Sequence, residues 1–205
     1  MQQNWLSLPQ IVNFRWHIIE KNKPFKVDGI DIDITPVAVH HGQRAIRKSS
    51  VTPAGPSVEG AKPKVALEPY LCFGFMCADT LVYMLDVSYI PQEAWDVIAG
   101  RSASFKAFVV DCLLLDSHIS HFGIKDVVES AKRIRAQKTY MVGFGHEIPH
   151  DGWEAVCRKI EGDDVGEVGT LVRNPVERVV ELRVGIEETL WMRPAYDGQF
   201  LAFND

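Results

Sequence analysis

Residues 105–115 read FKAFVVDCLLL, an apolar run that is interrupted only by Lys106 and Asp111. Such a run is typical of a strand that is buried on both faces of a sheet. Pro91 opens a predicted helix that ends at Ile98, before this strand. After it, residues 124–135 have the apolar spacing of one helical face, and residues 139–142 (TYMV) predict the next strand. This alternation predicts an α/β fold in which helices cover the sheet.

The remaining segments extend this pattern in both directions. The sequence predicts strands at residues 13–20, 30–39, 71–76, 81–85 and 199–203. It predicts further helices at residues 151–160 and 175–188. Asp28-Gly29 is a hairpin signal in front of the isoleucine-rich strand. Between residues 42 and 69 the chain is rich in Ser, Pro and Gly, so we expect a mobile loop over residues 44–68.

Composition and charge exclude several classes of protein. The 205 residues are 46% hydrophobic and carry a formal net charge of -5, with a pI of about 5.8. A dedicated binder of nucleic acid or of an anionic membrane would carry a basic patch, so we expect neither partner. No apolar run reaches the ~18 residues of a membrane span, and residues 1–8 do not resemble a signal peptide. Four scattered cysteines favour free thiols and a cytoplasmic location.

Four predicted strand ends carry residues that can bind a metal or transfer a proton. In chain order they are His40-His41, Asp86, His118 with His121, and His146. Ligands of α/β sheets usually bind at the carboxyl ends of strands, and imidazole with carboxylate suits zinc, manganese or iron. Each residue also has a structural interpretation, because a lone histidine is usually a hydrogen-bonded surface residue and Asp86 can cap a turn. The spacing alone leaves both interpretations open.

The order of these motifs resembles phosphodiesterase-type members of the metallo-β-lactamase superfamily. Residues 34–42, ITPVAVHHG, resemble a Thr-Pro-x-Pro-x-x-His segment whose last histidine binds a metal. Residues 85–91, LDVSYIP, resemble a Ser-Asp-x-x-x-x-Pro segment, with Leu85 in place of the serine. Residues 118–121, HISH, resemble the family's His-x-x-His loop. Residues 139–147, TYMVGFGHE, resemble the final Leu-Thr-His-x-x-His motif, in which Gly143 replaces the first histidine.

The resemblance implies a fold and a set of roles. The fold is the C-terminal half of a metallo-β-lactamase αββα sandwich, a mixed sheet covered by helices, and residues 1–205 form one partial domain. His41, Asp86 and His146 take metal-ligand positions, and Asp86 bridges two ions. His121 takes the position that assists proton transfer near the leaving group. The implied cofactors are zinc or manganese, two ions in complete members, and the implied substrate is a small phosphate ester.

The family's His-x-His-x-Asp-His motif, which provides four ligands, does not occur among these 205 residues. We therefore expect a truncated hydrolase that binds metal weakly and has little activity of its own. The alternative is a non-catalytic fragment or interaction module, which would form a homodimer through the sheet face that the missing half covers. An in-frame copy of the missing motif upstream of Met1 would favour the enzyme.

Overall fold

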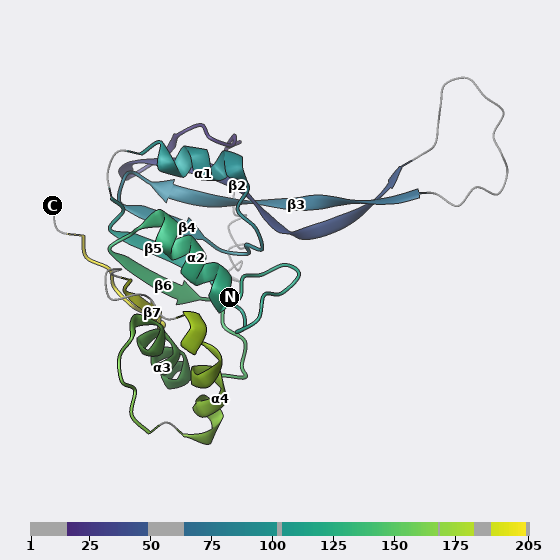
Figure 1. Cartoon of the computed structure of the whole chain (residues 1–205). Helices are drawn as coiled ribbons and strands as arrows, with labels where there is room; N and C mark the ends of the chain where they lie inside the picture. Colours follow the sequence, from purple (N-terminus) through teal and green to yellow (C-terminus); the bar gives the residue numbers. More distant parts are fainter. Residues whose placement is uncertain (1–15, 49–63, 102–103, 168, 183–189, 204–205) are drawn as a thin grey trace, which may run out of the picture.

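The described part of the chain contains one seven-stranded mixed sheet (Figure 1). The computed structural model describes residues 16–48, 64–101, 104–167, 169–182 and 190–203. The strands are β1 (Phe25–Val27), β2 (Ile30–Lys48), β3 (Lys64–Cys77), β4 (Leu81–Met84), β5 (Ala107–Asp111), β6 (Lys138–Val142) and β7 (Met192–Pro194), and they lie in that order across the sheet. The pairs from β1 to β4 are antiparallel, and those from β4 to β7 are parallel. The predicted α/β fold with a mixed sheet is confirmed.

Helices make the crossovers that parallel strands require. They are α1 (Gln92–Ala99), α2 (Ile124–Ile134), α3 (His150–Glu161), α4 (Thr170–Arg178) and the short 3₁₀ helix η1 (Val180–Leu182). The predicted helices at 91–98, 124–135 and 151–160 therefore exist with nearly the predicted ends. The one predicted at 175–188 instead begins at Thr170 and has Pro175 in its interior, and residues 183–189 lie outside the described residues. Among the described residues, no helix is long and apolar enough to cross a membrane.

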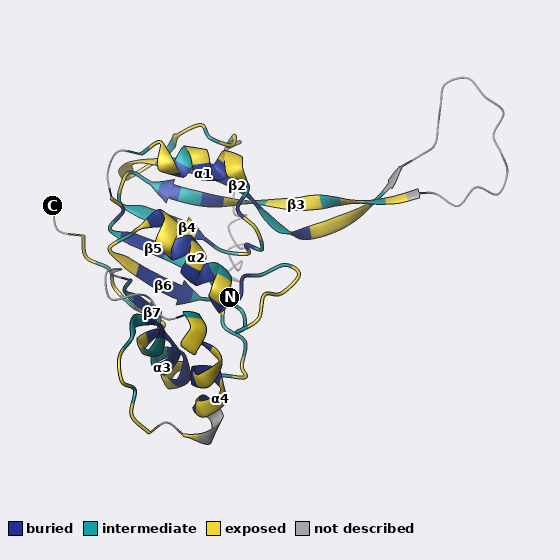
Figure 2. Cartoon of the chain, in the orientation of Figure 1, coloured by how far each residue is buried: buried dark blue, intermediate teal, exposed yellow. Residues whose placement is uncertain are grey.

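The hydrophobic core lies between the sheet and helices α1 and α2, and it continues into helices α3 and α4 (Figure 2). The register places Val82 of β4 beside Phe108 of β5, and Val110 of β5 beside Met141 of β6. These four side chains share one sheet face and are fully buried, because alternate residues of a strand point to the same side. The helix α2 covers this face with Val127, Val128, Ala131 and Ile134, the residues whose spacing predicted the helix. The core therefore holds the carboxyl ends of β4 and β5 in fixed positions.

β2 and β3 continue past the rest of the sheet as a paired two-stranded arm (Figure 1). Their pairing runs from Gln43 opposite Pro69 to Lys48 opposite Lys64. The predicted loop at 44–68 is therefore wrong at both ends, and residues 49–63 lie outside the described residues. The Ser, Pro and Gly residues that suggested a loop are concentrated in 49–63, whereas residues 44–48 and 64–68 contain none of them. Cross-strand pairing extends the sheet over these outer residues.

The two predicted terminal strands are not formed among the described residues. Residues 16–20 and 199–203 have no regular structure, and residues 13–15 lie outside the described residues. The sheet ends instead at the short strand β7, whose register pairs Met192 with Thr139. A three-residue strand has too few positions to show alternation in the sequence.

Candidate metal centre

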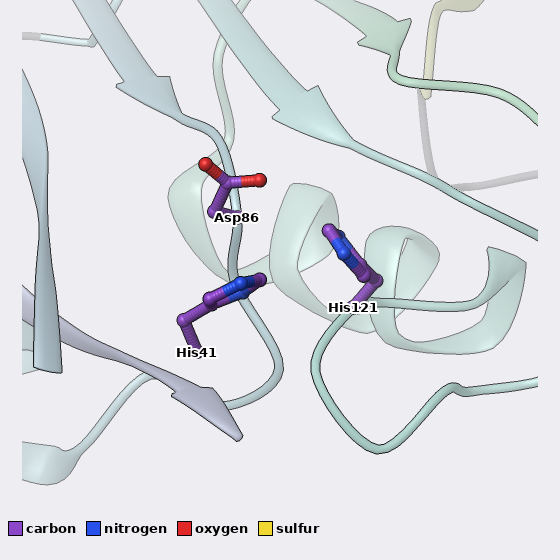
Figure 3. Close-up of side chains that lie close together, drawn as sticks. All are labelled: His41, Asp86 and His121. Carbon is purple, nitrogen blue, oxygen red and sulfur yellow. The ribbon is translucent and has the colours of Figure 1, made fainter. Parts of the chain in front are cut away.

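The side chains of His41, Asp86 and His121 face one another at one edge of the sheet (Figure 3). One ligand atom from each residue lies within 4.8 Å of the other two. His41 belongs to β2, Asp86 follows β4, and His121 lies in the loop between β5 and α2. The two histidines are half-buried and the carboxylate is exposed. Three segments that are distant in sequence thus present two imidazoles and a carboxylate to a common space.

Backbone hydrogen bonds hold the segment of His41 against the segment that follows Asp86. The Ser88 N–H donates to the carbonyl of His40 at 2.7 Å, and the His40 N–H donates to the carbonyl of Tyr89 at 2.9 Å. The Ser88 hydroxyl accepts from the Gly42 N–H at 2.8 Å and donates to the carbonyl of His40 at 3.1 Å. The register of β2 with β3 shifts between His40 and Gln43 at the same place. The bulge and these bonds place His41 next to Asp86.

Asp86 has a backbone conformation that most residues avoid. Its φ is +51°, in the left-handed region that aspartate and asparagine tolerate better than other residues with a side chain. The turn places its carboxylate near the two histidine rings (Figure 3). An uncommon backbone conformation thus presents a metal-capable carboxylate to the site.

Both histidines of the group have one ring nitrogen occupied by an acceptor. Nδ1 of His41 donates to the main-chain oxygen of Ser120 at 2.9 Å. Nδ1 of His121 donates to Oδ2 of Asp111 at 2.5 Å. Because a carbonyl and a carboxylate only accept, each neutral ring carries its proton on Nδ1 and its lone pair on Nε2. Histidine ligands of metals are commonly fixed in this way, with the second nitrogen donating to an oxygen.

Asp111 is the polar residue of the buried strand β5, and its side chain is only 5% exposed. Its carboxylate accepts from the ring of His121, and the main-chain N–H of Val87, which follows Asp86, also favours the ionised form of the carboxylate. Burial raises the pKa of this carboxyl group above its ordinary value, and the hydrogen bond from His121 opposes that shift. In the sequence, Asp111 stands out only as an interruption of an apolar run. A buried carboxylate needs hydrogen-bond partners, so its position was itself a signal of a nearby polar group.

The structure brings three of the four predicted site residues together. His41 and Asp86 lie side by side as predicted, and His121 takes the third place in the group. His146 is exposed in the turn after β6 and does not belong to the group found among the described residues. His118 is also exposed, and its Nδ1 lies 3.1 Å from the hydroxyl of Ser120. His40, which directly precedes His41 in the chain, packs against the ring of Tyr89. The centroids of the two rings are 5.1 Å apart.

Cys72 of β3 contacts the backbone of Asp86. Its thiol donates to the main-chain oxygen of Asp86 at 3.1 Å. Burial raises the pKa of Cys72 to about 11, and the negative charges of Asp86 and Asp111 add to that shift. The other cysteines, Cys77, Cys112 and Cys157, are also free thiols. Cys72 is therefore a protonated hydrogen-bond donor at neutral pH.

The donor set fits one borderline transition-metal cation. Two imidazole nitrogens and one carboxylate make up a common set of three protein ligands at catalytic zinc sites. Manganese accepts the same ligands, whereas calcium prefers sites made only of oxygen atoms. The hydrogen bonds to Nδ1 of His41 and His121 leave the two Nε2 atoms available for a cation. Ligands for a second cation are not part of the group found among the described residues.

Comparison with known proteins places the chain in a family. A family described as "Beta-lactamase superfamily domain" matches residues 3–144, which include every residue of the donor group. The chain belongs to the beta-lactamase superfamily. This membership confirms, at the level of the superfamily, the resemblance found in the sequence. No curated protein matches the chain.

Two solved structures with the superfamily's fold are similar to this chain. A new diphosphatase from the PhnP family is 19% identical, with a TM-score of 0.48, and the match covers 67% of this chain and 41% of that one. The metallo-β-lactamase-fold protein YhfI from Bacillus subtilis is 14% identical, with a TM-score of 0.48, and the match covers 88% of this chain and 52% of that one. The chain spans about half the length of these proteins or less.

Proposed function

We propose that this chain is a metal-dependent hydrolase of the superfamily with phosphodiesterase-like chemistry, acting on a small phosphate ester. One observation carries the proposal. His41, Asp86 and His121 present ligand atoms within 4.8 Å of one another, in segments that resemble motifs of the phosphodiesterase branch. Zinc or manganese suits this set. Membership of the superfamily supports hydrolysis as the class of reaction.

The residues of the site suit an anionic substrate only when a cation is present. A bound cation would neutralise charge on a phosphate oxygen and lower the pKa of a water molecule. The chain itself has a net charge of -5, and Asp86 is exposed, so these residues alone repel an anion. Asp86 is exposed to solvent, whereas the two histidines are half-buried. A substrate would therefore enter from the side of Asp86.

The same ligand count limits the activity that we expect. A catalytic zinc normally has three protein ligands and a water, and the described group offers three ligands in total. Complete members of the resembled branch use two cations, so the chain alone should bind metal weakly and turn over slowly. Full activity would require further ligands, from the same protein or from a second chain.

The experiment is hydrolysis of bis-p-nitrophenyl phosphate by the purified chain, with metal content measured after dialysis. We expect slow turnover that depends on added manganese or zinc, that His41→Ala abolishes and that His40→Ala leaves intact. His40 is the matched control because it is the neighbouring histidine but packs on Tyr89 outside the donor group. Turnover that is independent of metal, or equal in the two variants, would contradict the proposal.

A second candidate function is self-association through the sheet face opposite the core. The register pairs Phe75 with Tyr83, and alternation puts Phe73 on the same face. Phe73 is 38% exposed and Tyr83 is 37% exposed, in contrast to the fully buried Val82 and Met76 on the helix-covered face. Adjacent exposed aromatic residues favour contact with a second copy of the chain. Sedimentation velocity at low and high concentration should show a dimer that Phe73→Ser weakens, and a monomer at every concentration would exclude this role.

A further inference from the structure

Gly143 stands where the resembled motif has the first of its two histidines, and the structure shows what fills the space beside it. A Cβ atom at position 143 would lie well inside van der Waals contact with Oδ1 of Asp111. The φ of Gly143 is +77°, a conformation that favours glycine. The carboxylate of Asp111 therefore occupies the space into which a side chain at position 143 would have to project.

The same carboxylate contacts one member of the donor group. One of its oxygens accepts from Nδ1 of His121. The side chain of Asp111 is only 5% exposed, so it has little freedom to turn toward water. A single buried side chain thus fixes the ring of His121.

We propose that Asp111 is a positioning residue that holds His121 as the third metal ligand, and that this arrangement requires glycine at position 143. The proposal rests on the metal site of the proposed function, and it reassigns His121 from proton transfer to metal binding. Three protein ligands are the usual minimum for a catalytic cation, and His121 completes a set that His41 and Asp86 leave at two. The hydrogen bond to Asp111 leaves the lone pair of His121 on Nε2, where it is available to a cation.

The first test measures cobalt binding to the whole chain by visible absorption, with zinc affinity measured by competition. Replacing a residue that orients a metal-bound histidine typically weakens metal affinity about 10- to 100-fold. We expect a loss of that size in Asp111→Asn, with a changed cobalt spectrum, and no change in Asp96→Asn, an exposed carboxylate on α1. Equal cobalt affinity in wild type and Asp111→Asn would overturn the proposal, and so would a wild-type chain that binds no cobalt.

The second test disturbs Asp111 by a substitution at Gly143, the residue that lies beside its carboxylate. Gly143→Ala should displace the Asp111 carboxylate and weaken cobalt binding in the same direction as Asp111→Asn. Gly198→Ala is the matched control, because Gly198 has a φ of +78° but a Cβ added there would meet nothing within 4 Å. Both variants place alanine at nearly the same positive φ, and the contact with Asp111 occurs only at position 143. Equal cobalt affinity in the two alanine variants would show that position 143 does not act through Asp111.

A third measurement needs no variant. Nitrogen NMR of the metal-free protein reports which ring nitrogen of each histidine carries the proton. We expect His121 with its proton on Nδ1, and a proton on Nε2 would overturn the proposal. These readouts are independent of catalysis. Cobalt binding that depends on Asp111, without hydrolysis, would support this inference and contradict the proposed activity.

Discussion

The hydroxyl of Ser88 lies 2.8 Å from the main-chain nitrogen of Gly42 and satisfies a buried N–H at the bulge of β2. Removing the hydroxyl leaves that donor without its partner, which typically costs about 1–3 kcal/mol. We therefore expect Ser88→Ala to lower the free energy of unfolding by an amount in this range. Ser104→Ala is the control, because its exposed hydroxyl bonds to the carbonyl of Arg135. Urea titration of both variants measures the difference, and equal stabilities would show that this bond does not fix the bulge.

The sequence predicted the helical crossovers well because their signals are local. The spacing of Val127, Ala131 and Ile134 defines one face of α2 without reference to any other segment. The arm of β2 and β3 was missed because its stability comes from pairing between residues about twenty positions apart in the chain, such as Arg44 and Glu68. Local composition cannot report such pairing.

The site was predicted in part for the same reason. Motif order placed His41 and Asp86 together, although His41 lies inside β2 and not at the predicted strand end. The sequence also favoured His146 as a ligand, because it follows β6 and matches a motif. Only the structure shows that the carboxylate of Asp111 lies beside Gly143 and contacts the ring of His121. This contact brings together the end of β5, the residue after β6 and the loop between β5 and α2. The spacing of these residues in the sequence does not indicate that they meet.

Cys72 provides a chemical probe of the charge at the site. Its pKa of about 11 leaves about one thiol in a thousand ionised at pH 8, and only the thiolate reacts. We expect iodoacetamide to modify Cys72 about 100-fold more slowly than an ordinary thiol. Because the charge of Asp86 contributes to the raised pKa, Asp86→Asn should speed the reaction several-fold in metal-free protein.

Cys77 is an internal control for that experiment. It is also half-buried, but burial alone raises its pKa. Its alkylation rate should be the same in wild type and in Asp86→Asn. Mass spectrometry of the two peptides gives both rates from one sample. Equal acceleration of both cysteines would indicate a general loosening of the fold, not a change of local charge.

The arm should be dispensable for the stability of the rest of the chain. None of the buried core residues lies between Ala45 and Leu67 in the described part of the chain. Replacing residues 45–67 by Asn-Gly would join Arg44 to its cross-strand partner Glu68 through a two-residue turn. We expect a melting temperature within about 3 °C of wild type, since stability follows the buried core. A drop of about 10 °C or more would show that the arm packs on the fold.

Asp86 contributes a charged metal ligand and also tolerates a left-handed backbone conformation. Different substitutions can separate these two contributions. Asp86→Asn keeps a residue that tolerates a φ of +51° but removes the charged ligand, whereas Asp86→Ala removes the ligand and adds backbone strain. We expect both variants to lose metal affinity to the same extent. Asp86→Ala alone should be less stable, by about 1 kcal/mol relative to Asp86→Asn, the usual cost of the left-handed region.

Asp86→Gly completes this set of variants. Glycine adopts a positive φ without steric cost, so the glycine variant should be at least as stable as Asp86→Asn despite having no side chain. Urea titration of the metal-free variants gives the stabilities, and cobalt titration gives the affinities. If Asp86→Ala equals Asp86→Gly in stability, the turn relaxes on substitution and the backbone does not hold the carboxylate in place. If Asp86→Asn keeps full cobalt affinity, the carboxylate is not a ligand, and the site would have to bind metal through His41 and His121 alone.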